Sequence, residues 1–379
     1  MPLSAGGVLP GIGNITGGAR RAGPPDPARA APGRSGRGAK IGQEGYAEPR
    51  RGGLPAVRAG WPTDPAPAVD DERGGGMRIG LLGTGPWAER THAPALRRHE
   101  ELDFVGVWGR RPDAARDLAE RHGTRAYEDV DALLADVDAV ALAVPPAVQA
   151  RLAVRAARAG RHLLLDKPLA TDVAEGRAVA EAVRAAGVAS VVFFTVRFRP
   201  ETRAWIGEQA ARGGWFTARA QWLGAVFTGD SPYAASPWRR EKGALWDVGP
   251  HALSVLLPVL GDVRRVAAAT RGPGDTVHAV LDHAGGASSV LTLSLTAPPA
   301  AAGAAVELRG AAGVSVLPES ADEGAVPALL RAGDALLAAA RTGRPHPCDA
   351  AFALRVTEVL AEAEALLGGA APGGSPAGR

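Results

Sequence analysis

Three short segments carry the residue types that could bind a nucleotide and move a proton. They are residues 83–88 (Gly-Thr-Gly-Pro-Trp-Ala), Asp166-Lys167-Pro168 and the segment from Asp247 to His251, with roughly eighty residues between each and the next. A glycine loop can approach a dinucleotide, a lysine can donate hydrogen bonds to an oxygen, and a histidine can exchange a proton near neutral pH. Their order along the chain predicts a site for hydride transfer.

The first segment follows an apolar run at 78–82 and fits the pattern G-x-G-x-x-A. Gly83 permits a tight turn, Gly85 removes a side chain where the backbone must approach a pyrophosphate, and Ala88 is small enough for helix–strand packing. Pro86 is tolerated in the first turn of a helix, whose free N–H groups can bind phosphate oxygens. A strand–turn–helix without a ligand is the alternative. We expect the cofactor to contact Gly83, Thr84, Gly85, Pro86 and Trp87.

The next apolar run, 102–108, ends in Gly109-Arg110-Arg111. NAD-binding chains usually place an acid at this strand end, where it binds the ribose 2′-hydroxyl. Here Gly109 stands at that position, and two guanidinium groups follow that could bind a 2′-phosphate. We therefore predict that these three residues contact the cofactor, with NADP preferred and NAD as the second candidate. The alternative is that Arg110 and Arg111 merely face solvent.

Lys167 directly follows the apolar run 163–165 and Asp166, at the carboxyl end of an expected strand. That edge is where ligands bind in open α/β sheets. Pro168 restricts the backbone of the residue before it, which holds the lysine's position. Most lysines are solvated surface charges, so only the place of Lys167 in the order of segments makes it a candidate for the site.

Asp247 and His251 lie four residues apart, which places them on one face if the segment is helical. Pro250 belongs in the first turn of such a helix, or else the helix kinks there. A carboxylate that orients an imidazole suits proton transfer by that imidazole. An ordinary helix-start aspartate and a satisfied histidine are the alternative.

The elements expected to hold these residues divide the chain into two domains. Near-continuous apolar runs separated by amphipathic stretches predict a doubly wound parallel sheet over 77–196, with helices on both faces. Residues 197–368 predict an α+β domain with a large open mixed or antiparallel sheet, since short strands alternate with tight turns. The expected strands are 78–83, 102–108, 138–144, 162–165 and 189–194, then 215–227, 263–270, 276–283, 288–296, 304–309 and 313–317. The expected helices are 112–122, 147–159, 172–186, 200–212, 243–260, 325–341 and 349–367.

Residues 1–76 differ from the rest of the chain. They contain 18 glycines and 11 prolines without apolar periodicity, so we predict that they are disordered, as are residues 369–379. Met77 opens the first convincing strand, and we expect it to be the natural start. The whole net charge of +3 lies before it, which leaves the remainder neutral and argues against a nucleic-acid-binding face.

Cys348 is the only cysteine, which excludes a disulfide within the chain and fits a reducing cytoplasm. No apolar run of the sequence has the length that a bilayer requires, so no membrane partner is expected. No metal site is expected either.

Together the segments resemble the Gfo/Idh/MocA oxidoreductases, the family of glucose–fructose oxidoreductase and inositol dehydrogenase. The likeness rests on residues 80–88, on Asp166-Lys167-Pro168, on 243–253, and on 138–146, which are similar to the family's fourth strand and the proline-containing turn after it. It extends from about residue 77 to 367. The family's Glu-Lys-Pro motif stands here as Asp-Lys-Pro, which keeps the lysine.

The resemblance implies a Rossmann domain, and a second domain whose open sheet often mediates oligomerisation, here as a homodimer or homotetramer. It implies reversible oxidation of a secondary alcohol of a sugar, cyclitol or related polyol. The catalytic residues would be Lys167, Asp247 and His251. His251 would take the hydroxyl proton, Lys167 would stabilise the developing alkoxide, and Asp247 would orient His251 or a neighbouring substrate hydroxyl.

The resemblance also implies further residues in the cofactor site and in the substrate site. Further cofactor contacts would come from Val144, Pro145, Asp166, Lys167 and Pro168. Substrate contacts would come from Arg197, Trp238 and Arg239, for which structural packing is an equal alternative.

Three positions depart from the family's pattern: Ser254 where an acid is frequent, Gln149 where a histidine is frequent, and Glu241-Lys242-Gly243 where glycines are frequent. These departures leave the substrate class open, and no charged cluster in the sequence selects a charged sugar. Two other functions remain as alternatives. One is a catalytically silent NADP-binding regulator, against which the retained lysine, acid and histidine argue, and the other is a glycosidase that uses the nicotinamide transiently.

Overall fold

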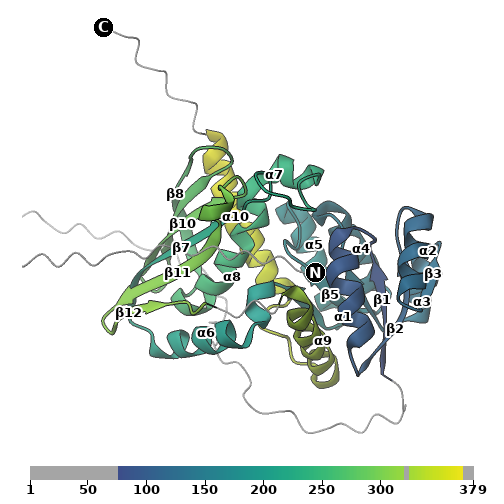
Figure 1. The fold of residues 1–379 in the computed structure, drawn as a ribbon. Helices are drawn as coiled ribbons and strands as arrows, with labels where there is room; N and C mark the ends of the chain where they lie inside the picture. The colour runs from purple at the N-terminus through teal and green to yellow at the C-terminus, as the bar shows by residue number, and fades with distance from the viewer. Residues whose placement is uncertain (1–75, 320–323, 370–379) are drawn as a thin grey trace, which may run out of the picture. The chain divides into compact units, whose positions relative to one another are not determined.

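Two six-stranded sheets organise the part of the chain that the structure, a computed structural model, describes: residues 76–319 and 324–369. Figure 1 shows both sheets with their helices. The disorder predicted for the two ends concerns residues that lie, apart from Gly76 and Gly369, outside the described ones.

The first sheet is parallel throughout and has the strand order β3-β2-β1-β4-β5-β6. Its strands are β1 (Met77–Leu82), β2 (Leu102–Trp108), β3 (Arg125–Tyr127), β4 (Ala139–Leu142), β5 (His162–Asp166) and β6 (Ser190–Phe193). This order confirms the predicted doubly wound Rossmann sheet. Because the order reverses between β1 and β4, the carboxyl ends of these two strands form the edge at which such sheets bind ligands.

Helices connect these strands, and aspartates cap two of them. The helical elements are η1 (Ala88–His92), α1 (Ala93–Arg98), α2 (Pro112–Arg121), α3 (Val130–Asp136), α4 (Pro146–Arg158) and α5 (Val173–Ala186). The Asp129 carboxylate accepts the N–H groups of the first turn of α3, and the Asp172 carboxylate accepts the Glu175 N–H at 3.0 Å at the start of α5. Gly187, with φ 66°, ends α5. Both devices satisfy backbone groups that a helix end leaves open.

The second sheet has the order β12-β11-β7-β10-β9-β8 and is mixed, as expected. Only the β7–β10 pair is parallel among the pairings of this described sheet. Its strands are β7 (Trp215–Leu223), β8 (Val263–Arg271), β9 (Val277–His283), β10 (Ser288–Ser294), β11 (Gly303–Gly310) and β12 (Gly313–Val316). Its other elements are η2 (Thr195–Phe198), α6 (Pro200–Arg212), α7 (Pro237–Asp247), α8 (Gly249–Leu260), η3 (Pro299–Ala301), α9 (Ala325–Thr342) and α10 (Ala350–Gly369).

The segment expected to be one helix over 243–260 is two helices. Val248 separates α7 from α8, and Gly243 interrupts α7 with φ 63°. Pro250 lies in the first turn of α8, where its missing N–H is tolerated. By length and composition alone the stretch Pro237–Leu260 could cross a membrane, but 83% of its most apolar window is buried in the fold. It therefore serves as core.

The last two helices contact both sheets. α9 packs against α1, β5 and β6, and Arg341 of α9 forms an ion pair with Glu101 at 2.5 Å. α10 packs against β8 and against α5. Just before α10, the Cys348 carbonyl accepts the Val192 N–H of β6 at 2.7 Å. These contacts fix the second sheet and its helices against the carboxyl edge of β5 and β6, where Lys167 lies.

Candidate active site

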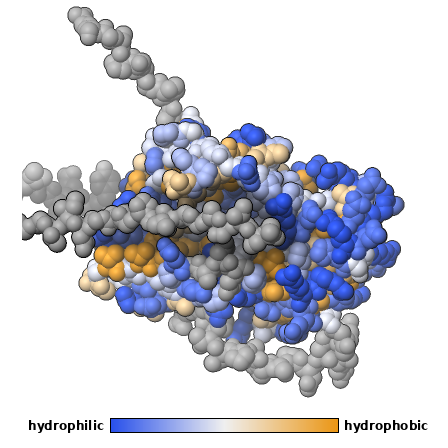
Figure 2. Space-filling model, viewed as in Figure 1, coloured by the Kyte–Doolittle hydropathy of each residue, from blue (hydrophilic) through white to orange (hydrophobic). Residues whose placement is uncertain are grey.

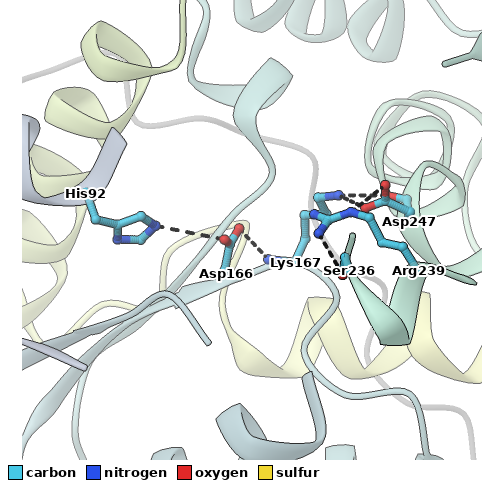
Figure 3. Close-up of polar contacts among 6 residues, drawn as sticks. All are labelled: His92, Asp166, Lys167, Ser236, Arg239 and Asp247. Carbon is cyan, nitrogen blue, oxygen red and sulfur yellow. Dashed lines mark hydrogen bonds and ion pairs between the residues drawn. The ribbon is translucent and has the colours of Figure 1, made fainter. Parts of the chain in front are cut away.

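Lys167 and Asp247 form a buried ion pair that joins the two domains. Lys167 directly follows β5, and Asp247 is the last residue of α7. The Lys167 Nζ donates to the Asp247 Oδ1 at 2.7 Å and to the Asp247 backbone carbonyl at 2.7 Å, and the two side chains are only 12% and 7% exposed. The Arg239 Nε donates to the other carboxylate oxygen, Oδ2, at 3.0 Å (Figure 3). Both carboxylate oxygens are therefore held by cations.

These contacts keep Asp247 ionised. Burial acts to raise the pKa of its carboxyl, but the charges and hydrogen bonds of Lys167 and Arg239 outweigh burial and lower the pKa to about 2. A carboxylate in this state cannot exchange protons near neutral pH. Asp247 therefore acts here by holding the lysine and the arginine.

His251 lies in the first turn of α8, with its ring stacked on Trp222 of β7 at a centroid distance of 5.5 Å and an interplanar angle of 17°. Its Nδ1 is buried without a hydrogen-bond partner among the residues that the structure describes. Burial, and after it the positive charge of Lys167, hold the pKa of His251 well below its usual value. The imidazole is therefore neutral near pH 7 and can accept a proton.

The expected pairing of Asp247 with His251 takes a different form. Because the helix breaks at Val248, the two residues end one helix and begin the next, and they do not share one continuous helical face. In the described segments no hydrogen bond joins them, and the Asp247 carboxylate binds Lys167 and Arg239. The Trp222 ring, which the sequence did not single out, positions His251.

Gln149 of α4 holds the loop that carries Lys167. Its buried side-chain Nε2 donates to the backbone carbonyls of Asp166, Pro168 and Leu169 at 2.7, 3.0 and 3.2 Å, and its Oε1 accepts the Asp166 N–H at 2.8 Å. The Lys167–Pro168 peptide bond is cis. The position noted above as a departure from the family's pattern thus fixes the backbone of the Asp-Lys-Pro segment.

The Asp166 carboxylate contacts its own chain and a buried histidine. Its Oδ1 accepts the Lys167 N–H at 2.9 Å, and its Oδ2 lies 3.9 Å from the Nε2 of His92 (Figure 3). His92 is fully buried at the end of η1, with its ring 6.3 Å from that of Phe193. His92 was not among the predicted site residues, because nothing in the local pattern of η1 shows that it meets Asp166.

In the glycine loop there is room for a ligand at Gly85 and none at Gly83. A Cβ atom on Gly83, whose φ is 136°, would lie 2.3 Å from the Ala143 carbonyl oxygen, so the loop passes directly against the end of β4. A Cβ on Gly85 would meet no atom within 4 Å beyond its two neighbours in the chain, and the helix begins at Pro86. Free N–H groups and open space at this point fit a pyrophosphate. The ring of Trp87 lies 6.1 Å from that of Tyr233 in the second domain.

The ends of β2 and β4 adjoin this loop. Gly109 is buried, and a Cβ there would lie 2.5 Å from the Thr84 Cγ2, so no acidic side chain fits at this position without a shift of Thr84. Arg110 and Arg111 are exposed. Val144 lies beside Gly83, since its Cγ1 is 3.3 Å from where a Gly83 Cβ would stand, and Pro145 precedes the first residue of α4. The end of β2 thus carries no acidic side chain at position 109 and presents two exposed arginines directly after it.

Of the three expected substrate residues, Arg239 and Trp238 lie together near Asp247, and Arg197 lies in the interior. Arg239 reaches the site through Asp247, and its guanidinium carbon lies 4.6 Å from the centre of the Trp238 ring. Arg197 does not fit the role expected for it: it is 4% exposed, its Nη1 donates to the Ser254 carbonyl at 2.6 Å, and it faces the Phe352 ring. The 3₁₀ turn η2 directs it into the interior. The charge that acts on His251 from this segment belongs to Arg199.

No group of three or more His, Cys, Asp or Glu side chains among residues 76–319 and 324–369 is arranged to hold a metal ion. The groups that converge are a lysine, a neutral histidine, an ionised aspartate and arginines, beside a glycine loop suited to a dinucleotide.

Two family descriptions match the two domains. Residues 77–194 match the oxidoreductase family with an NAD-binding Rossmann fold, GFO_IDH_MocA, and residues 219–316 match the GFO/IDH/MocA C-terminal domain. The chain belongs to the GFO/IDH/MocA oxidoreductase family. This confirms the resemblance seen in the sequence and identifies the first domain as a nicotinamide-nucleotide-binding domain.

Similar proteins of this family include sugar enzymes. The chain is 31% identical over 208 residues to dTDP-3,4-didehydro-2,6-dideoxy-alpha-D-glucose 3-reductase of Actinomadura kijaniata, covering 52% of this chain and 61% of that protein. It is 31% identical over 228 residues to D-apiose dehydrogenase of Paraburkholderia graminis, covering 56% and 59%. The chain thus spans less than two thirds of the length of these relatives. The fold is similar to that of GenD2 from gentamicin A biosynthesis, solved in complex with NAD, with a TM-score of 0.68, 22% identity, and coverage of 78% of this chain and 95% of that one.

The two glycines of the loop should separate folding from cofactor binding. Gly83→Ala should lower the free energy of unfolding by about 3 kcal/mol, because the new Cβ meets a backbone carbonyl at a positive φ. Gly85→Ala should change it by less than about 0.5 kcal/mol, yet weaken NADPH binding at least 10-fold, since the methyl group occupies the space left for the pyrophosphate. Urea unfolding and fluorescence titration with NADPH measure both. Wild-type affinity in Gly85→Ala would remove the loop from the cofactor site.

The neutral state of His251 should appear in the pH dependence of stability. In the unfolded chain this histidine takes up a proton as the pH falls through about 6.5, whereas the folded chain resists protonation. The free energy of unfolding of the wild type should therefore fall, relative to that of His251→Gln, by on the order of 1 kcal/mol between pH 7.5 and 5.0. Urea unfolding of both proteins at the two pH values measures the difference. Parallel behaviour would show that His251 protonates freely in the folded state.

Proposed function

We propose that the chain is an NADP-dependent oxidoreductase that interconverts a secondary alcohol and a ketone of a sugar, cyclitol or related polyol. The observation that carries the proposal is the Lys167–Asp247 ion pair, which brings the lysine of the Rossmann domain beside the neutral His251 of the second domain. The names of the sugar reductase and sugar dehydrogenase among its relatives support the substrate class. NADP, when bound, supplies or accepts the hydride.

The hydrogen bonds that Lys167 already makes indicate how it can bind the substrate. An ammonium group has three N–H donors. Two of them bind the carboxylate and the carbonyl of Asp247, which leaves one for a substrate oxygen. An alkoxide that develops on this oxygen is stabilised by the ammonium charge in a partly buried setting.

His251 then acts as the general base when the alcohol is oxidised, and as the general acid in the opposite direction. A neutral imidazole accepts the hydroxyl proton directly, and a base placed in this way contributes about 10²–10⁴-fold to the rate. Trp222 restricts the ring to one plane. Asp247 positions Lys167 and Arg239 and remains an anion throughout.

The preference for NADP rests on the end of β2. Thr84 occupies the space that a side chain at position 109 would need, and the exposed Arg110 and Arg111 follow directly. A guanidinium group binds a phosphate through two parallel hydrogen bonds. This edge therefore favours a ribose that carries a 2′-phosphate over one that needs a carboxylate partner.

The outer face of the second sheet supports a homodimer or homotetramer. α7 and α8 pack against β10, whereas Val290 is 38% exposed and Val316 is 55% exposed, in the cross-strand row that also contains Arg219 and Glu307. Apolar surface is visible in Figure 2 over the region where β11 and β12 lie. Light scattering measures the oligomeric state, and a monomer at micromolar concentration would contradict this part of the proposal.

The setting that we propose for the enzyme is the cytoplasm. Its only cysteine, Cys348, is buried, and burial raises the pKa of the thiol, so this residue is suited to a reducing compartment. Fractionation of cells that express the tagged chain locates it, and recovery outside the cytoplasm would contradict the assignment.

Variants of the two reacting residues test the proposal. Reduction of NADP⁺ should be screened across inositols, aldoses, sugar acids and sugar phosphates, and with the best substrate Lys167→Ala and His251→Ala should each lower kcat by about 10²–10⁴-fold. Both variants should still bind NADPH. Lys242→Ala, which removes a lysine paired with Glu364, is the matched control and should keep the wild-type kcat. If kcat is unchanged in both test variants, the catalytic assignment is wrong.

The basic end of β2 should set the cofactor preference. In the double variant Arg110→Ala/Arg111→Ala the KM for NADPH should rise roughly 10-fold or more, because a hydrogen-bonded charge contact is lost. The KM for NADH should change by less than about 2-fold, because NADH has no 2′-phosphate to lose. Steady-state kinetics with both cofactors measures the two values. Equal rises would mean that the arginines do not contact the 2′-phosphate.

A further inference from the structure

Arg199 stands at the start of α6, in a segment that is fastened to the first turns of α8. Two residues earlier, the Arg197 Nη1 donates to the Ser254 carbonyl at 2.6 Å, and the Ser254 Oγ in turn donates to the His251 carbonyl at 2.7 Å. η2 and α6 both pack against α8. These contacts bring the backbone of Arg199 alongside the helix turn that presents His251.

Arg199 differs from the other cations around His251 in having no partner. Lys167 and Arg239 are both bound to Asp247 (Figure 3). The Arg199 side chain has no hydrogen bond or ion pair with any of the residues described, although its Nε is buried. Buried polar groups are nearly always hydrogen-bonded in folded proteins, and leaving one unsatisfied costs free energy. Arg199 is half-buried, and its Nε is therefore available to a group from outside the chain.

The charges around the reacting oxygen also leave an excess of cations. Lys167, Arg239 and Arg199 bring three positive charges to this region against the two carboxylates of Asp247 and Asp166, and His251 is neutral, so one positive charge is in excess. A neutral polyol would leave this excess uncompensated. An anionic substituent would compensate it and would meet a planar fork of donors suited to carboxylate or phosphate.

We propose that the substrate carries an anionic group, a carboxylate or a phosphate, and that Arg199 binds this group while Lys167 and His251 engage the reacting hydroxyl. The inference rests on the proposed function and narrows its substrate class from polyols in general to sugar acids or sugar phosphates. Arg199 thereby selects the substrate and orients it, and it takes no part in the transfer of the proton.

Binding of matched sugars to the enzyme–NADPH complex tests the inference. The probes are glucose, galactose and mannose, each with its own uronate and 6-phosphate, so that within a series only the group at C6 changes. With NADPH bound the alcohols cannot be oxidised, and calorimetry reports affinity alone. In at least one series the uronate or the 6-phosphate should bind roughly 10- to 100-fold more tightly than the neutral sugar, the gain expected for a hydrogen bond to a charged group. Which of the two gains affinity identifies the anionic group.

Variants of Arg199 show whether this residue is the cause. Arg199→Gln should abolish the advantage of the anionic sugar and leave the affinity for the neutral one unchanged, and Arg199→Lys should restore part of it. Arg264→Gln removes the same charge from an exposed position of β8 and should behave as the wild type. Neutral sugars that bind as tightly as their acids, no acid-selective binding in any series, or an equal loss for both kinds of sugar in Arg199→Gln would each overturn the inference.

The same experiment separates this inference from the proposed function. An enzyme that reduces NADP⁺ with neutral polyols, and loses this activity in the Lys167 and His251 variants, retains the proposed function and refutes the role of Arg199. Acid-selective binding that depends on Arg199, without NADP⁺ reduction by any sugar, supports the anion site and refutes the oxidoreductase proposal.

Discussion

The ion pair between Lys167 and Asp247 is the contact on which the site depends. Its partners come from different domains, and both side chains are almost fully buried. Removal of one partner from such a pair leaves an uncompensated buried charge, at a cost of about 3–5 kcal/mol. The pair forms only when α7 lies against the carboxyl end of β5, so the lysine and the histidine converge only when the second domain is docked. Docking and assembly of the site are therefore one event.

The same contact sets the protonation states. Arg239 and Lys167 keep Asp247 ionised against the effect of burial, and the charge of Lys167 joins burial in keeping His251 neutral. The imidazole is therefore in the neutral form that a general base requires, next to an ammonium that can bind the oxygen of the same hydroxyl. The same cations stabilise the alkoxide and disfavour the imidazolium, so they keep His251 neutral before the proton transfer while they weaken it as a base.

The sequence was sufficient for the elements whose signal is local. Most strands and helices appear within a few residues of their predicted bounds, because their apolar runs and caps are contained in the segment itself. β3 and α3 were missed, since a strand of the composition Arg-Ala-Tyr has no apolar run and α3 is short. The spacing of Asp247 and His251 suggested a shared helical face, but the helix breaks at Val248, and the apolar pattern of the segment does not reveal this break. Likewise, only the 3₁₀ turn of η2 decides that Arg197 enters the core and Arg199 does not.

Gln149 shows why a departure from the family's pattern can preserve the site. The loop that carries Lys167 needs one group that both accepts an N–H and donates to carbonyls, and a side-chain amide does both at fixed positions. An imidazole at this position could titrate near neutral pH and alter those hydrogen bonds, whereas an amide does not titrate. The hydrogen bonds by which Gln149 holds the Lys167 loop therefore do not depend on the protonation of the side chain at position 149. A substitution at position 149 consequently affects the rigidity of the loop that carries Lys167. It does not change which residue acts as acid and base, because that residue is His251 of α8.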